Sequence, residues 1–277
     1  MEEFLEAAIL GVVQGLTEFL PISSTGHLIL TAELLGIDDD KFGLRFDASI
    51  HLGTLAAVLV YFRVTVVRLI VAWCASIPAR DWQHTPESRL AWLLVLGTIP
   101  AGIAGLALES VVEEELRDPA IVGAMLILFS VPMVAAERYG ARTRDVSDAR
   151  PSDAVAVGAA QAIALIPGVS RSGITISTGM FAGFRREEAA TFAFLLSAPI
   201  IAAAGGKQIF DLLRGQEAGA SAGLDVYVAG LLTAGLVGYA AVAFLLRFLR
   251  TNTLYPFVYY RVVLGLLVLG LVAAGVL

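Results

Sequence analysis

The residues best suited to chemistry lie near the N-terminus, in the stretch GVVQGLTEFLPISSTGH of residues 11–27. Gln14 and Glu18 are four residues apart, so on a helix they share one face. After Pro21 the chain carries three hydroxyls and an imidazole, at Ser23, Ser24, Thr25 and His27. In an apolar chain such polar groups are costly, and they indicate a functional site.

These side chains could support proton transfer and nucleophilic attack. Ser24 is a candidate nucleophile, and His27, one helical turn on, could exchange a proton with it or with a phosphate oxygen. Glu18 could hold a divalent cation or act as a base, with Gln14 supporting either role.

A second polar stretch, IPGVSRSGITIS, occupies residues 166–177. Arg171 stands among small and hydroxyl residues at an expected helix start, where its planar donor fork, backbone N–H groups and the helix dipole all favour an anion. Phosphate suits such a site best. The neighbouring candidates for anion binding are Ser170, Ser172, Gly173 and Thr175. Together the two stretches indicate phosphoryl transfer.

The composition places these residues in a membrane protein. The chain has 277 residues, is 57% hydrophobic and 16% charged, and has a mean hydropathy of +0.79. Soluble domains are nearer one quarter charged. The single Cys74 excludes an internal disulfide, and because the chain starts with acidic residues we expect no cleavable signal peptide.

Residues 7–36 are apolar but interrupted by Pro21, which predicts a helix hairpin that enters and leaves the membrane on the same side. The helix before Pro21 is expected to have about fourteen residues, about 21 Å, too short to span. Full spans are predicted at 46–62, 90–108 and 119–137. Residues 63–89 are expected to form an interfacial helix (64–76) and a loop (78–88).

The pattern then restarts after a polar linker at 138–153. The second hairpin is predicted at 154–183, with spans at 189–210, 226–246 and 256–277. The repeat halves, 1–138 and 150–277, form a single membrane domain. Four pairs of residues match at a constant offset of 147: Gly11 with Gly158, Gln14 with Gln161, Ser23 with Ser170, and Gly26 with Gly173.

Three spans in each half predict that the halves are inverted, and the basic residues support this. Twelve arginines fall on one face, which the positive-inside rule assigns to the cytoplasm. Both termini and the opening of the site are then expected on the outer face. The twelve are Arg63, Arg68, Arg80, Arg89, Arg138, Arg142, Arg144, Arg150, Arg185, Arg186, Arg247 and Arg250; the other face receives Lys41, Arg45, Arg117, Lys207 and Arg214.

The motifs resemble a known family. QGLTEFLPISSTGH and PGVSRSGIT are similar to the two signatures of the undecaprenyl-diphosphate phosphatases of the bacitracin-resistance type. FDASIHLGTLAAVLVYFR and PFVYYR extend the likeness over essentially the whole chain. The resemblance implies an all-α polytopic fold with about six transmembrane helices and two re-entrant hairpins in an inverted repeat. It also implies hydrolysis of a C55 isoprenyl diphosphate to the monophosphate, which recycles the lipid carrier of cell-wall peptidoglycan synthesis.

By the same resemblance, Glu18 is the carboxylate of metal binding and catalysis, and Ser24 and His27 are nucleophile and acid/base partner, in either order, or activators of a water. Arg171 binds the diphosphate. Many members have glutamate where this chain has Gln14, so a cation, Mg²⁺ or Ca²⁺, is expected to be held loosely, and no organic cofactor is expected. The expected substrate-binding residues are Gln14, Ser23, Thr25, Ser170, Ser172, Gly173 and Thr175.

Other polar residues are assigned structural roles. His51, one turn after Asp47, is interpreted as a paired structural residue, and His84 as a solvated loop residue. Arg261 is expected to snorkel to the cytoplasmic interface. An interfacial aromatic belt is predicted for Tyr255, Tyr259 and Tyr260.

The rival interpretation is a polyprenyl-phosphate flippase or transporter, because inverted repeats with midplane hairpins also build carriers. The groups at Glu18, Ser24 and His27 favour an enzyme, since a carrier needs only an anion site. The expected partners are the polyprenyl diphosphate and the bilayer of the cell membrane, with no nucleic acid. A homodimer is compatible with the sequence.

Overall fold

The computed structural model describes residues 1–37, 42, 44–114, 116, 118–213 and 223–277. The predicted outer-face residues Lys41, Arg117 and Arg214 lie outside these ranges. The described chain is helical, with one isolated β-bridge between Arg144 and Phe184. Its elements are α1 (Glu2–Phe19), α2 (Ser24–Leu35), α4 (Leu44–Tyr61), α5 (Arg63–Ala79), α6 (Pro86–Glu114), α7 (Pro119–Leu128), α8 (Ser130–Tyr139), η1 (Val146–Asp148), α9 (Pro151–Ile163), α10 (Arg171–Phe181), α11 (Arg186–Leu213), α12 (Leu224–Leu249) and α13 (Tyr255–Ala273).

Five helical segments of the described chain are long and apolar enough to cross a membrane. They are Pro86–Leu108, Pro119–Tyr139, Arg186–Lys207, Leu224–Leu249 and Tyr255–Ala273. A sixth is obtained if Ser49–Tyr61 and Arg63–Ala79, which are bent by 85° at their junction, count as one span. These segments confirm the predicted all-α polytopic membrane fold.

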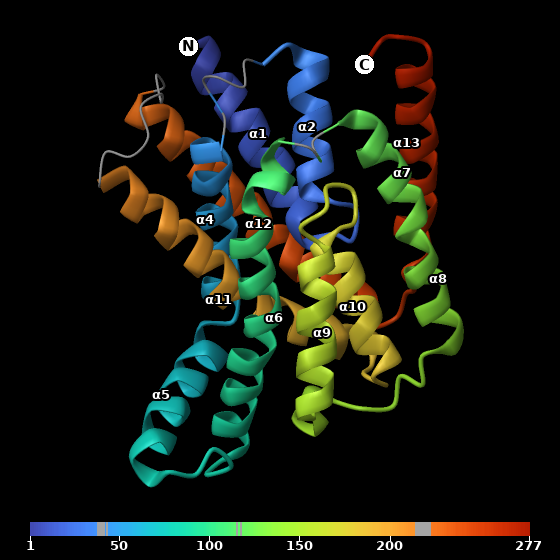
Figure 1. Ribbon diagram of the computed structural model, residues 1–277. Coiled ribbons are helices and arrows are strands. Elements are labelled where there is room, and N and C mark those ends of the chain that lie inside the picture. The colour runs from blue at the N-terminus through green and yellow to red at the C-terminus, as the bar shows by residue number, and fades with distance from the viewer. Residues whose placement is uncertain (38–41, 43, 115, 117, 214–222) are drawn as a thin grey trace.

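The two helix hairpins, α1–α2 and α9–α10, reach the middle of the molecule from opposite ends (Figure 1). Each breaks near a proline, Pro21 or Pro167, which has no backbone N–H to continue a helix. α1 begins five residues earlier than predicted and has 18 residues, a length of about 27 Å. The expected length of fourteen residues was therefore wrong, because the helix continues through Glu2, Glu3 and Glu6.

Two further boundaries differ from the predictions. The loop expected at 78–88 is shorter, because α5 continues to Ala79 and α6 already begins at Pro86. Proline is well tolerated at a helix start, since its missing N–H would have no partner there. The predicted span 119–137 is divided at Phe129 into α7 and α8. Pro132 explains this division, because its ring clashes with the carbonyl of residue 128.

Glycines let the hairpins pack closely against the spans. A Cβ added at Gly15 of α1 would lie 2.7 Å from the carbonyl oxygen of Ala234 in α12. In the other repeat, a Cβ at Gly158 of α9 would lie 2.0 Å from the carbonyl oxygen of Gly97 in α6. Helix backbones that approach this closely gain the van der Waals contact that holds helices together in lipid. In both repeats, a glycine of the hairpin thus allows close packing against a neighbouring span.

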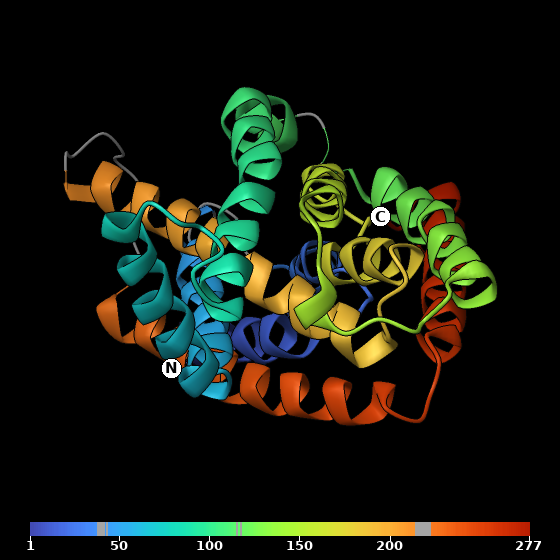
Figure 2. The ribbon, with the colours of Figure 1, turned by 90° about the horizontal axis from the view of Figure 1, so that it is seen from below.

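The spans surround the hairpins on two sides. Viewed from below, α7, α8 and α13 lie on one side of the hairpins, and α4 and α5 lie on the other (Figure 2). Glu137 of α8 joins several elements at one end. Its carboxylate accepts hydrogen bonds from the guanidinium of Arg186 at 2.6 to 3.0 Å and from the backbone N–H of Leu254 at 2.7 Å. These bonds fix the start of α13, which later contributes to the site.

Candidate active site

Both hairpins turn at a serine that adopts an unusual backbone conformation. Ser23 has φ 76° and Ser170 has φ 73°, in the left-handed region that side chains rarely adopt. Each serine caps the helix that follows, since its Oγ accepts from the backbone N–H of Gly26 at 3.4 Å or of Gly173 at 3.1 Å. Such a backbone conformation costs on the order of 1–3 kcal/mol and persists only where the surrounding structure enforces it.

The two turns are bonded to each other. Ser23 Oγ also accepts from the N–H of Gly168 at 3.1 Å, and Ser172 Oγ donates to the carbonyl of Leu20 at 2.9 Å. Ser170 Oγ lies 3.2 Å from Ser172 Oγ. Irregular backbone at membrane depth requires such partners. Ser23 and Ser172, both predicted to bind substrate, thus join the two hairpins, and Ser170, also predicted to bind substrate, contacts Ser172 within the second hairpin.

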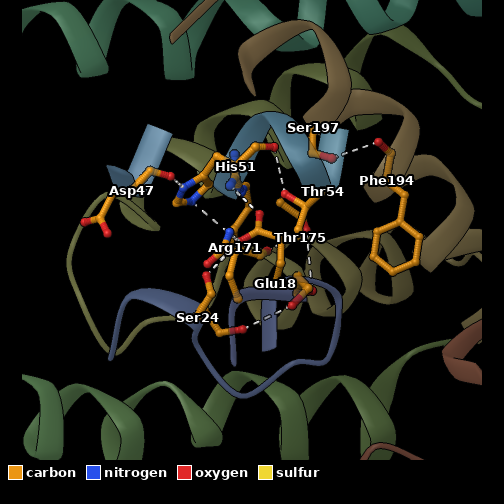
Figure 3. A network of polar contacts seen from close by, with 12 residues as sticks. Glu18, Ser24, Asp47, His51, Thr54, Arg171, Thr175, Phe194 and Ser197 are labelled. Carbon is orange, nitrogen blue, oxygen red and sulfur yellow. Dashed lines mark hydrogen bonds and ion pairs between the residues drawn. The ribbon is translucent and has the colours of Figure 1, made fainter. Parts of the chain in front are cut away.

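Glu18 is the centre of the polar network between the hairpins (Figure 3). Its side chain is 3% exposed. Oε1 forms an ion pair with Nη2 of Arg171 at 2.5 Å. Oε2 accepts from Ser24 Oγ at 2.7 Å and from Gln14 Nε2 at 3.1 Å. The structure therefore brings together four of the predicted site residues.

This network gives each group a chemical capability. The hydroxyl of Ser24 donates to a carboxylate, which is the geometry by which a base activates a nucleophile. Arg171 stands at the first position of α10, and Nη2 is its only nitrogen with a side-chain partner among the described residues. Its other guanidinium N–H groups and the start of α10 can therefore bind an anion.

His27 contacts the backbone of Ser23 and the side chain of Tyr260, and its proton exchange with Ser24 or with a phosphate oxygen stays a prediction. Nδ1 of His27 lies 2.6 Å from the carbonyl oxygen of Ser23, and Nε2 lies 2.7 Å from the hydroxyl of Tyr260. The two rings are also stacked, with centroids 5.6 Å apart. Ser24 points back to α1, whereas His27 points to α13, so both ring nitrogens have other partners.

His51 belongs to this network, although the sequence pattern suggested a structural residue. Its Nδ1 lies 2.6 Å from the carbonyl oxygen of Asp47, so the expected pairing is made, but with the backbone. Its Nε2 faces Glu18 Oε2 at 3.7 Å, and its side chain is 26% exposed. The only signal in the sequence was a histidine within an apolar segment. That α4 packs beside α1 is decided by the tertiary structure.

Arg261 is fully buried, so the prediction that it snorkels to the interface was wrong. Its Nη2 donates to the carbonyls of Gly168 and Val169 at 3.0 and 3.1 Å, and its Nε donates to Ser130 Oγ at 3.1 Å. The broken backbone before α10 leaves carbonyls that need donors, and Arg261 supplies them. α13 therefore contacts both hairpins, through Tyr260 and Arg261.

The remaining predicted site residues are buried or half-buried near the starts of α2 and α10. Thr175 is buried, and its hydroxyl donates to the carbonyl of Arg171 at 2.6 Å. Gly173 is buried in the first turn of α10, and Thr25 is half-buried in the first turn of α2. Gln161, which matches Gln14 in the repeat, is buried and has no side-chain partner among the described residues.

The side chains that could hold a cation here are those of Glu18 and Gln14. Gln14 Oε1 is buried and has no partner within the described chain. One carboxylate with neutral oxygens is typical of sites where Mg²⁺ takes its other ligands from a bound phosphate and water. No three His, Cys, Asp or Glu side chains of the described residues cluster as a complete site.

A cavity of about 390 Å³ lies between α1, α2, α4 and the start of α7. Apolar residues such as Leu10, Leu28 and Phe42 form part of its lining. Glu33 and Asp47 also line it. Because Asp47 is one turn from His51, the cavity approaches the polar network from the end at which the first hairpin enters.

The chain is similar to characterised protein families over nearly its full length. The family described as bacitracin resistance protein BacA matches residues 7–267. Proteins named undecaprenyl-diphosphatase are 44% identical in Rubrobacter xylanophilus, over 98% of this chain and 99% of the relative, and 43% identical in Thermobifida fusca, over 99% and 91%. A third, from Myxococcus xanthus, is 45% identical over 98% of this chain and 90% of its own. The two hairpins of this chain meet at Glu18 and Arg171. Because the family match covers residues 7–267, the chain belongs to the BacA family.

Proposed function

We propose that this protein is an integral membrane phosphatase that hydrolyses a polyprenyl diphosphate of the undecaprenyl type to the monophosphate and inorganic phosphate. The observation that carries the proposal is the buried carboxylate of Glu18, which is shared by the Ser24 hydroxyl of one hairpin and the Arg171 guanidinium of the other. A nucleophile, a base and an anion-binding group are the parts that phosphoryl transfer requires. The names of the relatives support the same activity.

In the proposed reaction, Arg171 and the start of α10 bind the terminal phosphate. The oxygen of Ser24 attacks its phosphorus while the hydroxyl proton passes to Glu18 Oε2, 2.7 Å away. The bond to the bridging oxygen breaks, and the lipid monophosphate leaves with that electron pair. A water molecule then attacks the phosphoserine, giving inorganic phosphate and restoring Ser24. A water that attacks directly, with Glu18 as base, is the alternative within the same site.

A divalent cation at this site remains part of the proposal. Glu18 and Gln14 are the residues that would hold it, together with oxygens of the diphosphate, and Glu18 would then position the cation instead of taking the proton. When bound, it would neutralise phosphate charge as Arg171 does. Gln14 in place of a second carboxylate makes the expected binding weak.

The outer surface of the protein also suits a lipid partner. Helices facing outward carry many exposed apolar side chains, such as Leu106, Leu236 and Leu266, which are 73%, 74% and 60% exposed. We propose that the prenyl chain lies along such surfaces in the cell membrane, with the site open to the outer face. A homodimer would cover part of the same surface.

The decisive experiment is phosphate release from a C55 diphosphate by the purified protein in detergent, where transport cannot be observed. Arg171→Ala is expected to lower turnover by about 10²- to 10³-fold, as when one preorganised charge-stabilising donor is removed. Arg68→Ala, which changes an exposed arginine of α5, is the control. Arg171→Lys retains the charge that balances Glu18 but not the fork, so it should fold and still be impaired. Full turnover by Arg171→Ala would refute the proposal.

A further inference from the structure

The ring of His51 lies beside Glu18 without a hydrogen bond between them. Nε2 and Glu18 Oε2 are 3.7 Å apart, which is too long for a hydrogen bond. The two groups point toward each other from α4 and α1, so a small ligand between them would contact both (Figure 3).

The tautomer of His51 is fixed by its other contact. The carbonyl of Asp47 can only accept, so Nδ1, at 2.6 Å, carries the proton. In the neutral ring the lone pair then lies on Nε2, which faces Glu18. Histidine ligands of metals almost always have this arrangement, with the second ring nitrogen donating to a carbonyl, a carboxylate or a water. His27 differs, because both of its nitrogens contact groups of the protein.

The separation of the two groups is close to that of two ligands of one cation. With bonds of about 2.1 Å, neighbouring ligands lie about 3.0 to 3.4 Å apart. The observed 3.7 Å between Nε2 and Oε2 would need to close by only a few tenths of an ångström. Gln14 Oε1, buried and without a partner among the described residues, belongs to a side chain that already contacts Glu18 and is a candidate for a neutral oxygen ligand.

The cavity between α1, α2 and α4 reaches Asp47, one helical turn from His51. Two acidic residues, Glu33 and Asp47, are among those that line it. Asp47 is common to both features, since it lines the cavity and its carbonyl lies 2.6 Å from Nδ1 of His51. Negatively charged residues that line a cleft raise the local concentration of cations.

We propose that His51 is a nitrogen ligand, through Nε2, of the divalent cation at Glu18. Imidazole favours Zn²⁺ and the later transition metals, whereas Mg²⁺ and Ca²⁺ prefer oxygen. His51 therefore raises the affinity of the site for Mn²⁺, Co²⁺ and Zn²⁺ relative to Ca²⁺. The inference rests on the proposed function for the presence of a cation, and it assigns the ligand set and the class of metal.

The test uses Mn²⁺ as a paramagnetic probe of the full-length, untagged protein in detergent. Electron spin echo measurements detect the imidazole nitrogen of a bound histidine. The chain has only three histidines, so each can be replaced in turn, as His27→Gln, His51→Gln and His84→Gln. We expect nitrogen modulation in the wild type and in the His27 and His84 variants, and its loss in His51→Gln. The dissociation constant for Mn²⁺ should rise at least about tenfold in His51→Gln.

A second variant keeps the test valid if His51→Gln fails to fold. His51→Glu keeps a ligand at this position but supplies oxygen, so it should bind Mn²⁺ without nitrogen modulation and bind Ca²⁺ more tightly than the wild type. The inference would be refuted if the wild type showed no nitrogen modulation, or if the modulation persisted in both His51 variants. Phosphate release by the same wild-type preparation is measured separately. Release without modulation refutes the ligand alone, whereas modulation without release refutes the phosphatase alone.

Discussion

The hydroxyl of Ser24 donates to Oε2 of Glu18 across the break of the first hairpin, at 2.7 Å. This contact is possible because the chain reverses at the break, which brings the start of α2 back toward the end of α1. Ser24 is at the first position of α2, so its backbone also lies at the positive end of a helix dipole. An oxygen that loses its proton is stabilised there.

The first prediction concerns the phosphoenzyme. In a single turnover with substrate labelled at the terminal phosphate, acid quenching should trap the label on the wild-type chain as phosphoserine. Ser24→Ala should remain unlabelled and turn over about 10²- to 10⁴-fold more slowly. Ser152→Ala, at an exposed serine of α9, is the matched control and should resemble the wild type. Undiminished turnover in Ser24→Ala would exclude serine as nucleophile.

The second prediction concerns the contact between α13 and the first hairpin. Tyr260→Phe removes the hydroxyl that lies 2.7 Å from His27 Nε2. The variant should lose about 0.5–1.5 kcal/mol of stability, the usual contribution of one hydrogen bond, and its turnover should fall only a few-fold. Thermal unfolding in detergent and phosphate release measure the two effects. Tyr259→Phe, at the neighbouring tyrosine that is 67% exposed, should change neither. A Tyr260→Phe effect as large as that of Ser24→Ala would instead give His27 a direct part in the chemistry.

The third prediction concerns the support of the second hairpin. Arg261→Met leaves the carbonyls of Gly168 and Val169 without their donor. Each unsatisfied buried group costs about 1–3 kcal/mol, so the midpoint of thermal unfolding should fall strongly. Arg250→Met removes an arginine whose side chain is 69% exposed and paired with Glu187, and should cost about 0–1 kcal/mol. Equal midpoints for the two variants would contradict the assigned role of Arg261.

The fourth prediction concerns the loop before α10. Gly168 has φ 91°, and a Cβ at this position would lie 2.6 Å from the carbonyl oxygen of Val122. Gly168→Ala should therefore destabilise the protein by about 1–3 kcal/mol and displace Arg171. Phosphate release should fall with it. In Gly105→Ala, nothing lies within 4 Å of the added Cβ, so the helix should gain about 0.5–1 kcal/mol. Unfolding midpoints of both variants, measured in one detergent, give the comparison.

The sequence alone determined the membrane class and the two hairpins. Residues that act locally decide these features, because Pro21 and Pro167 have no backbone N–H to continue a helix, and Ser23 and Ser170 cap the helices that follow. The offset of 147 residues predicted that both turns are alike, and Ser23 and Ser170 do adopt nearly the same φ. The shared face of Gln14 and Glu18 follows from helical spacing, and their side chains are bonded at 3.1 Å.

Only the tertiary structure decided which other helices reach the site. Periodicity shows that a helix has a buried face but not which helix covers it, so nothing local indicated that α4 brings His51 to Glu18 or that α13 brings Tyr260 to His27. Arg261 was misplaced for the same reason. A lone arginine near a helix end usually reaches the interface, unless a broken backbone elsewhere in the fold needs its donors. In this protein the carbonyls of Gly168 and Val169 need them.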